Sequence, residues 1–257
     1  METSEVKSFY DDFLESKMLE YRIRDNPRID QATERILQFV DPDSNVLDVG
    51  CGIGIVPERV ATMLEEGHVW AFDISERNIW YARETVDDPS VSFFVGDAVE
   101  GRQKIQDRLS APIDVITLVD VIEHIPQDQH ADLFRFFGSI ASERSFIVLT
   151  YPSPQYQRHL IKNDPEELQI IDQVIELDEM REAARNAGFS LRHYSLETIW
   201  KRNQYVHCVL QSDDSLAAQP VESKGFLDKI ISRIRLSWQH RVVHPMKRWK
   251  YVDRIFS

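Results

Sequence analysis

The sequence predicts an α/β fold in which a doubly wound, mostly parallel sheet carries helices on both faces. Short apolar runs alternate with longer amphipathic segments between residues 27 and 152, which is the pattern of strands joined by crossover helices. The glycine-rich stretch VLDVGCGIG at 46–54 follows the first apolar run, as in the ligand-binding loops of such sheets. Towards the C-terminus, two apolar runs follow each other with few residues between them and are expected to pair antiparallel.

The composition limits the class of protein. The 257 residues suit one domain with an appendage, and 42% hydrophobic with 28% charged residues is typical of a globular chain. No apolar run approaches the roughly 20 residues of a membrane span, and the first residues lack the features of a secretory signal. Cys51 and Cys208 lie too far apart for metal-ligand spacing, so we expect free thiols in a cytoplasmic protein.

The net charge of -13 is unevenly distributed along the chain. Residues 221–257 carry nine basic and three acidic groups, whereas residues 1–220 carry 21 basic and 40 acidic groups. The acidic body argues against nucleic-acid binding, because that function requires Lys and Arg to neutralise phosphates.

The elements expected before residue 152 follow from periodicity and local signals, in chain order. The first helix covers 3–22, and a second at 27–40 begins with Pro27 in its first turn. Apolar, β-branched runs then predict parallel strands, and the segments between them, one of them capped by Ser75, predict helices. The expected strands are 45–50, 68–74, 91–98, 112–122 and 144–152, and the expected helices are 56–67, 75–86 and 127–141.

The alternation stops after the fifth expected strand. Residues 152–176 contain three prolines and many polar groups, and we interpret them as an insertion. An amphipathic stretch at 177–189 predicts a helix. The two final strands are expected at 190–200 and 204–212.

The last part of the chain is expected to be a basic amphipathic helix. Trp238, Trp249 and Phe256 recur with other apolar residues at helical spacing among Lys and Arg. Such a helix either lies on an anionic membrane surface or packs on the body or on a second subunit. The expected parts of the chain are a helical lid at 1–27, the α/β domain at 28–211 with its insertion at 152–176, a linker at 212–225 and the tail at 226–257.

The residues around the glycine loop indicate its ligand. A dinucleotide loop would read G-x-G-x-x-G, but position 55 is Ile, and no Gly-Lys-Ser/Thr of a P-loop follows. Asp48 would repel a pyrophosphate and attract the positively charged groups of S-adenosylmethionine. Asp73 ends the second expected strand, where an acid accepts hydrogen bonds from ribose hydroxyls. Ile74 and Asp97 are expected to contact the adenine.

Four stretches, VLDVGCGIG, AFDIS, VGDA and DVITLVDVIEHI, resemble in order and spacing the successive motifs of class I S-adenosylmethionine-dependent methyltransferases. The resemblance covers residues 28–211 and implies a seven-stranded, Rossmann-like sheet whose last strand is inserted antiparallel. It also implies methyl transfer with S-adenosylmethionine as the cofactor. The residues expected to bind this cofactor are Asp48, Gly50, Gly52, Gly54, Asp73, Ile74, Asp97, Ala98 and Asp120.

The candidates for catalysis follow the fourth expected strand. His124 is expected to accept the proton of the acceptor, with Glu123 beside it, although both could instead hold the strand end and the cofactor loop together. Asp120, Glu123 and His124 could also ligate a divalent metal, since E-x-x-E-H resembles the pattern of small-RNA 2′-O-methyltransferases and ubiquinone-pathway O-methyltransferases. A metal is not favoured, because Asp120 replaces the first Glu and Asp172 and Gln173 stand where a further His is expected.

Acceptor recognition is expected in the parts that are not common to the fold. The lid and the insertion carry rings beside amide, imidazole and carboxylate groups, which suit O-methylation of a sugar or another polyhydroxylated acceptor. A lipid-linked glycan fits if the tail binds a membrane. Two alternatives stay open: an oxidoreductase that uses NAD(P) or a nucleotide sugar, and a non-catalytic module that binds the cofactor. The expected acceptor-binding residues are Tyr10, Tyr151, Tyr156, His159, Gln169 and Asp172.

Overall fold

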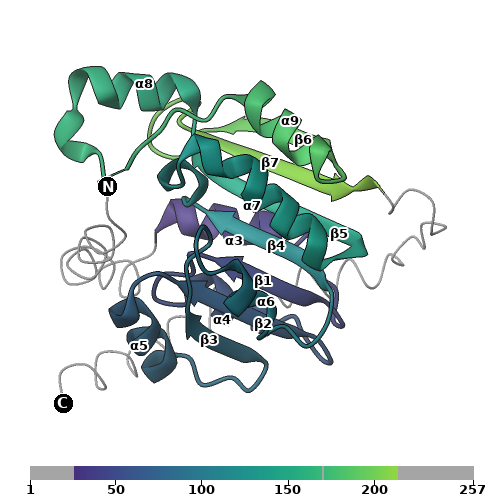
Figure 1. Cartoon of the computed structure of the whole chain (residues 1–257). Coiled ribbons are helices and arrows are strands. Elements are labelled where there is room, and N and C mark those ends of the chain that lie inside the picture. Colours follow the sequence, from purple (N-terminus) through teal and green to yellow (C-terminus); the bar gives the residue numbers. More distant parts are fainter. Residues whose placement is uncertain (1–25, 170, 214–257) are drawn as a thin grey trace, which may run out of the picture.

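The computed structural model describes residues 26–169 and 171–213, which form a sheet with a layer of helices on each face (Figure 1). The sheet has seven strands in the order β3-β2-β1-β4-β5-β7-β6. The first five strands run parallel, and β7 pairs antiparallel with both β5 and β6, which confirms the predicted fold class. The strands are β1 Asn45–Val49, β2 His68–Asp73, β3 Val91–Val95, β4 Ile113–Val119, β5 Ala141–Pro152, β6 Phe189–Glu197 and β7 Tyr205–Ser212.

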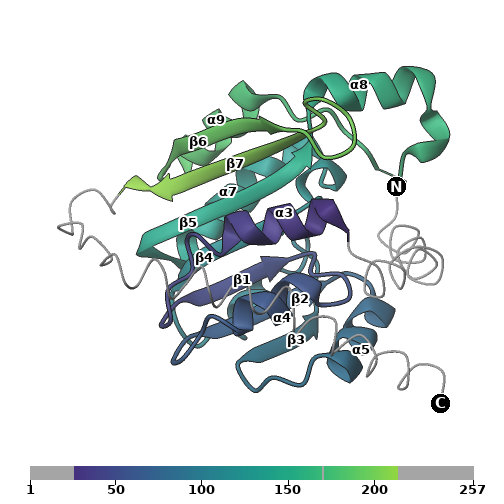
Figure 2. The same cartoon turned by 180° about the vertical axis from the view of Figure 1, so that it is seen from behind.

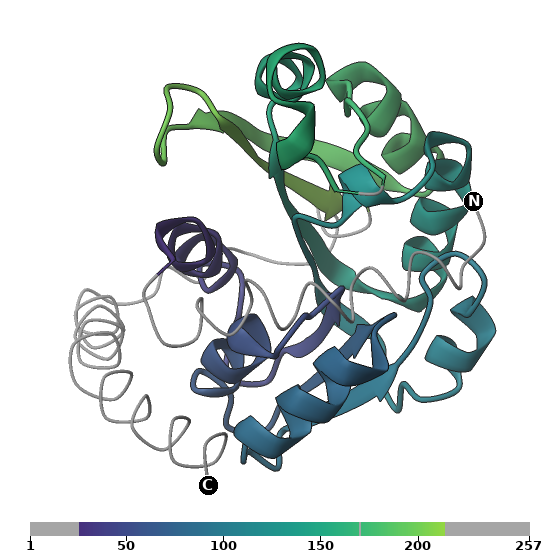
Figure 3. The same cartoon turned by 90° about the vertical axis from the view of Figure 1, so that its left-hand side faces the viewer.

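The helices divide between the two faces of the sheet (Figures 2 and 3). Helices α3, α4 and α5 cover one face, and α6, α7 and α9 cover the opposite face. Helix α8 extends from the end of β5. The helices are α3 Pro27–Ile36, α4 Ile55–Ala61, α5 Glu76–Thr85, α6 Arg102–Gln106, α7 Gln127–Ile140, α8 Pro154–Asn163 and α9 Leu177–Asn186, with short 3₁₀ turns η2 Ile122–His124 and η3 Pro165–Glu167.

Alternating side chains of the strands build two apolar cores. In β1, Val46 packs in the core beneath α3, α4 and α5, whereas Leu47 packs in the core beneath α6, α7 and α9. Phe134 and Phe137 of α7 are fully buried in this second core and meet edge to face. Because both faces of the sheet are covered at its centre, β1, β2 and β4 are buried along almost their whole length.

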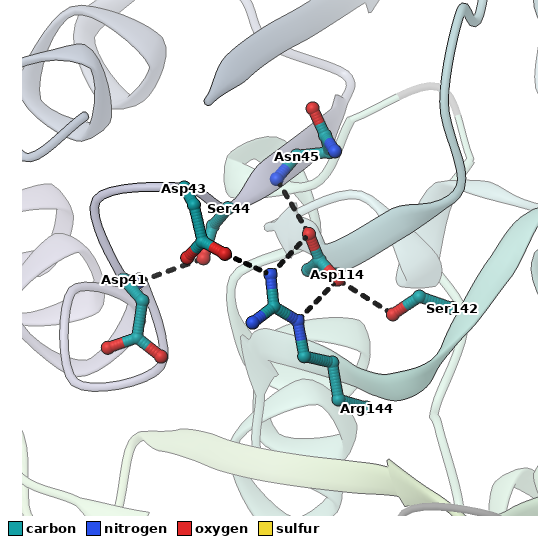
Figure 4. Close-up of polar contacts among 7 residues, drawn as sticks. All are labelled: Asp41, Asp43, Ser44, Asn45, Asp114, Ser142 and Arg144. Atoms are coloured by element: carbon teal, nitrogen blue, oxygen red, sulfur yellow. Dashed lines mark hydrogen bonds and ion pairs between the residues drawn. The ribbon is translucent and has the colours of Figure 1, made fainter. Parts of the chain in front are cut away.

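A polar cluster joins the amino ends of β1, β4 and β5 (Figure 4). Asp114 accepts hydrogen bonds from the Asn45 amide at 2.9 Å, from Oγ of Ser142 at 2.7 Å and from Nε of Arg144 at 2.9 Å. Arg144 also binds Asp43 at 2.9 Å. Burial alone would raise the pKa of Asp114, but the bonds from Arg144, Asn45 and Ser142 outweigh it and hold this pKa below its usual value.

The structure differs from the sequence-based prediction in the insertion, which contains helix α8. The Ser153 side chain accepts a hydrogen bond from the Tyr156 amide, and Pro154 occupies the first turn. A capping residue followed by proline is a helix-start signal, so these residues carried evidence for α8 that the prediction did not use. Helix α6 has no predicted counterpart either, because five residues are too few to show a helical period.

Several predicted boundaries also differ, among them the end of the helix expected at 27–40, which is Ile36. Helix α4 ends at Ala61 instead of residue 67, because the amides of 65–67 all donate to the carbonyl oxygen of Pro42. Strand β5 begins at Ala141, whereas the sequence predicted that this strand begins at residue 144. Three expected segments lie wholly or almost wholly outside the described residues. They are the helix at 3–22, the linker at 212–225 and the tail at 226–257. Within the described ranges, no helix is long and apolar enough to cross a membrane.

Candidate active site

A cavity of about 650 Å³ lies at the carboxyl ends of the parallel strands. Its wall comes from the residues that follow β1, β2, β3 and β4, together with parts of α3 and α8. The strand order reverses between β1 and β4, which is where open parallel sheets usually bind ligands. Small molecules and cofactors occupy cavities of about 300–1,000 Å³, so this cavity has a suitable size.

Two glycines of the loop after β1 are required by the packing of the protein itself. Gly50 has a φ of +68°, and a Cβ atom there would lie 2.5 Å from Cγ2 of Val121. Gly54 begins α4 with a φ of +80°, and a Cβ atom there would lie 2.9 Å from Cζ of Phe93. Gly50 and Gly52 line the cavity, whereas Gly54 lies outside its lining, so the close packing of α4 explains the third glycine.

Asp48 is a buried carboxyl group at the end of β1, with 2% of its surface exposed. Its Oδ1 atom accepts a hydrogen bond from Oγ1 of Thr117 at 2.5 Å, whereas Oδ2 is buried without a partner. Desolvation raises the pKa of Asp48 to about 7, with a further contribution from the charge of Asp73. A buried oxygen that lacks a donor is destabilising, so this site favours a ligand with a positively charged donor group.

Asp73 fixes the glycine loop to the start of α5. Its carboxylate accepts hydrogen bonds from the backbone amides of Gly52 and Ser75, each at 2.9 Å. At the end of β3, Oδ1 of Asp97 accepts from two backbone amides of the turn that follows. The cofactor residues expected from the sequence that do line the cavity are Asp48, Gly50, Gly52, Asp73, Ile74, Asp97, Ala98 and Asp120.

Asp120 directly follows β4 with a φ of +55°, which is uncommon for a residue that has a Cβ atom. Its Oδ2 atom lies 2.7 Å from Nη1 of Arg28, and the same nitrogen donates to the Tyr205 hydroxyl at 3.1 Å. Burial raises the pKa of Asp120, and the charge of Arg28 opposes that shift. Arg28 thereby connects α3, β4 and β7 at the cavity wall.

His124 is held in a defined orientation in η2. Its Nδ1 atom lies 2.5 Å from the carbonyl oxygen of Ile171 and 3.3 Å from Oδ1 of Asp172. Because a carbonyl oxygen only accepts, Nδ1 carries the proton, and the lone pair of the neutral ring is on Nε2. Burial lowers the pKa of His124, with the Ile171 and Asp172 contacts opposing the shift, so the ring is neutral near pH 7.

Glu123 lies beside this histidine and is 2% exposed. Its Oε1 atom lies 3.9 Å from Nε2 of His124, and Oε2 is buried without a hydrogen-bond partner. Burial and the charge of Asp120 raise its pKa well above the usual value. Within residues 26–169 and 171–213, there is no group of three or more His, Cys, Asp or Glu side chains that could hold a metal ion.

The structure brings only part of the expected acceptor-binding set to the cavity. Tyr156, Gln169 and Asp172 line it. Tyr151 is fully buried in the apolar core, and His159 faces Asp164 at 3.4 Å on the outer part of α8, so neither lines the cavity. Tyr10 lies outside the described residues.

Several lining residues were not among the expected acceptor-binding residues, although Gln157 belongs to the polar set of the insertion that was expected to recognise the acceptor. Gln157 of α8 is 1% exposed, and both polar atoms of its amide lack a hydrogen-bond partner. The Ser153 cap of α8 is the sequence signal that would have placed Gln157 on a helix. Arg28, Trp200, Gln204 and Tyr205 also line the cavity, and no local pattern in the sequence indicates them.

Comparisons with known proteins agree with this arrangement. A family model described as a methyltransferase domain matches residues 18–194. Indolepyruvate C-methyltransferase from Streptomyces griseus is 26% identical over 133 residues, which are 49% of this chain and 39% of that protein. This chain therefore spans about two fifths of the length of that curated relative.

Solved structures share the fold. Magnesium protoporphyrin IX methyltransferase from Synechocystis PCC 6803 with bound SAH superposes with a TM-score of 0.64 at 15% identity, over 82% of this chain and 100% of that chain. An S-adenosylmethionine-dependent methyltransferase from Mesorhizobium loti gives a TM-score of 0.59 at 16% identity, over 74% and 99% of the two chains. At these identities the likeness shows the fold alone.

Proposed function

Because the chain belongs to the family of class I S-adenosylmethionine-dependent methyltransferases, we propose that it transfers a methyl group from S-adenosylmethionine to an oxygen of a polyhydroxylated acceptor. The observation that carries the proposal is the buried, unpartnered Oδ2 atom of Asp48 beside the glycine loop. The ammonium group of this cofactor would supply the charged donor that Oδ2 lacks. Family membership argues against the NAD(P) or nucleotide-sugar oxidoreductase that the sequence alone left open.

One wall of the cavity fits this cofactor from the glycine loop to the end of β3. Carboxylates suit its ammonium and ribose hydroxyl groups, and an apolar side chain suits the face of the adenine. When bound, the cofactor supplies a methyl group that its positive sulfonium already activates. We assign Asp48 to the ammonium, the backbone at Gly50 and Gly52 to the methionine chain, Asp73 to the ribose, and Ile74, Asp97 and Ala98 to the adenine.

We assign His124 as the base that removes the proton of the acceptor hydroxyl. Its Nε2 atom carries the lone pair, since Nδ1 faces the carbonyl oxygen of Ile171. Asp172, at 3.3 Å from Nδ1, would stabilise the imidazolium that forms when Nε2 takes up the proton. The low pKa of His124 keeps the ring neutral and therefore able to accept that proton.

For the acceptor we propose a sugar or another polyhydroxylated small molecule. Tyr156 and Trp200 offer ring faces, and Gln157 offers an amide that binds hydroxyl groups. The proposal includes a lipid-linked glycan, because membrane binding by the tail at 226–257 would bring the site close to such an acceptor. This part of the proposal rests on the sequence alone.

A second candidate is transfer to carbon. The similarity to indolepyruvate C-methyltransferase favours it. In that reaction Nε2 of His124 would take a proton from a carbon next to a carbonyl group. Carbon–proton NMR of an isotopically labelled product separates the two, because methyl groups on oxygen and on carbon have different chemical shifts.

The test of the proposed function has two stages. Calorimetry should detect binding of S-adenosylmethionine by the purified full-length protein. Transfer of a labelled methyl group to members of a set of sugars and glycosides should then be measured. Failure to bind S-adenosylmethionine would contradict the proposal at its first step, and binding without transfer to any acceptor would favour the non-catalytic module.

A further inference from the structure

Acidic groups strongly outnumber basic groups on the cavity wall. Among the described residues that line it, nine are Asp or Glu, and Arg28 alone is Lys or Arg. The Arg28 guanidinium is bound to Asp120 at 2.7 Å and to the Tyr205 hydroxyl at 3.1 Å. On this wall, therefore, an acceptor with a carboxylate or phosphate group meets repulsion.

Most of the buried polar atoms without a partner on the cavity wall are hydrogen-bond acceptors. Oε2 of Glu123 and Oε1 of both Gln157 and Gln169 are buried without a partner, as is Oδ1 of Asp120. Nε2 of Gln157 is a buried donor on this wall that also lacks a partner. Glu123 and Gln157 are 2% and 1% exposed, so neither is solvated from outside the cavity. A ligand that fits these atoms must bring donors, because an unsatisfied buried acceptor is destabilising.

We infer that the acceptor carries a positively charged amino group, which Oε2 of Glu123 binds close to the reacting hydroxyl, and that the site rejects carboxylated and phosphorylated acceptors. This inference rests on the proposed function, because it concerns the acceptor of the same methyl transfer. An ammonium group brings three donors and a positive charge, whereas a carboxylate brings only acceptors. Within polyhydroxylated molecules, the chemical class is an amino sugar.

Two observations support Glu123 as the residue that selects the amine. Its Oε1 atom lies 3.9 Å from Nε2 of His124, so a group held by this carboxylate is near the base. Burial and the charge of Asp120 raise the pKa of Glu123, which means that the ionised form lacks a sufficient positive partner in the protein. The ammonium group of the cofactor is not the missing positive partner of Glu123, because that group is assigned to Asp48 at the glycine loop.

The test compares three glycosides of the same size and ring. Methyl glucoside is neutral, its 2-amino-2-deoxy analogue is cationic, and methyl glucuronide is anionic near pH 7. Saturation-transfer NMR with the full-length protein saturated with SAH should rank the amino glycoside first, with an affinity about 10-fold above the neutral one and no signal from the glucuronide. Equal or stronger binding of the glucuronide would overturn the inference, and so would the absence of all three signals while SAH is bound.

A pair of variants assigns the preference to one side chain. Glu123→Gln should remove the roughly 10-fold preference for the amine. Glu167→Gln, a matched change at an exposed carboxyl group of the same wall, should keep it. Unchanged preference in Glu123→Gln would overturn the assignment, and if that variant does not fold, the ranking by the wild-type protein still decides.

The outcomes also separate this inference from the proposed function. Failure of the protein to bind SAH would overturn the proposed function itself. A methylated nitrogen in the product would contradict transfer to oxygen and leave recognition of the amine standing. Transfer to a neutral sugar with no preference for its amino analogue would leave the proposed function intact and remove the inference.

Discussion

If Asp48 binds the ammonium group as proposed, cofactor binding should depend on pH. Its buried carboxyl group has a pKa of about 7, so binding of an ammonium group to the carboxylate releases a proton below that pH. We expect the affinity for S-adenosylmethionine, measured by calorimetry, to increase by up to about 10-fold per pH unit between about pH 5 and pH 7 and then to level off. Asp48→Asn should bind more weakly and with a flatter pH dependence.

The same group affects the stability of the unliganded protein in the opposite direction. Because the pKa of Asp48 is raised from 3.8 to about 7 on folding, its contribution to the free energy of unfolding is full below the lower value. This contribution is lost as the pH rises to about 7. A denaturation series on wild type and Asp48→Asn should show this difference, and identical pH profiles would contradict the raised pKa.

Two glycines with positive φ separate the effect of backbone strain from that of packing. Gly50→Ala adds a Cβ atom 2.5 Å from Val121, whereas Gly188 has a φ of +84° and nothing within 4 Å of that position. Gly188→Ala should therefore lower the free energy of unfolding by about 1–2 kcal/mol from strain alone. Gly50→Ala should lower it further, and a smaller loss than in Gly188→Ala would contradict the close contact with Val121. Urea denaturation measures both.

His124 gives the sharpest catalytic test at the residue scale. If Nε2 is the base, His124→Ala should lower kcat by a factor of about 10²–10⁴ and leave the calorimetric affinity for S-adenosylmethionine nearly unchanged. Because burial lowers the pKa of His124, the wild-type rate should reach its plateau at a lower pH than it would with an unburied imidazole. Asp172→Asn should lower kcat less and shift this pH profile. Loss of affinity in parallel with rate would instead support a structural role for His124.

At the scale of elements, the cluster around Asp114 joins three strands at the end opposite the cavity. Asp114→Ala leaves the Asn45 amide, Ser142 and Arg144 without their shared acceptor and should lower the free energy of unfolding by about 1–3 kcal/mol. Asp43→Ala, which removes only an exposed contact of Arg144, should cost less than about 1 kcal/mol. Denaturant midpoints at neutral pH measure both, and equal losses would contradict a central role for Asp114.

The cluster also predicts how this loss depends on pH. The pKa of Asp114 is lower in the folded protein than its usual 3.8, so its contribution to stability is complete above that value. It is lost as the pH falls through the lower, folded pKa. The difference between wild type and Asp114→Ala should therefore shrink in acid, and a constant difference down to about pH 2 would contradict the lowered pKa.

The elements were largely predictable from the sequence because burial on both faces makes the central strands mostly apolar and the helices between them amphipathic. The location of the site was also predictable, because parallel strands bring their carboxyl ends, and the residues that follow them, to one edge of the sheet. Contacts between distant segments were not. Arg28 and Tyr205 are 177 positions apart, and no local pattern indicates that they meet at Asp120. Tyr151 was misplaced because the register of β5 turns it into the core.

At the scale of the whole molecule, the charge asymmetry of the sequence predicts membrane attachment through the tail. Each Lys or Arg near an anionic surface contributes about 1 kcal/mol, and salt screens this attraction. We expect the full-length protein to sediment with anionic vesicles at low salt and less so at high salt. A chain that ends at Gln219 should stay in the supernatant and still bind S-adenosylmethionine. Absence of sedimentation, or failure of the shorter chain to fold, would make the tail a packing element.

The order of the strands has a consequence for synthesis of the protein. β7 is the last described strand in the sequence, yet it lies between β5 and β6. While the ribosome is still translating residues 205–212, β5 has an open edge and β6 has no neighbour to pair with. Open strand edges recruit other chains, so nascent copies are prone to aggregate during this interval. The yield of folded protein should therefore depend on how soon β7 leaves the ribosome and on chaperones that cover β5 until then.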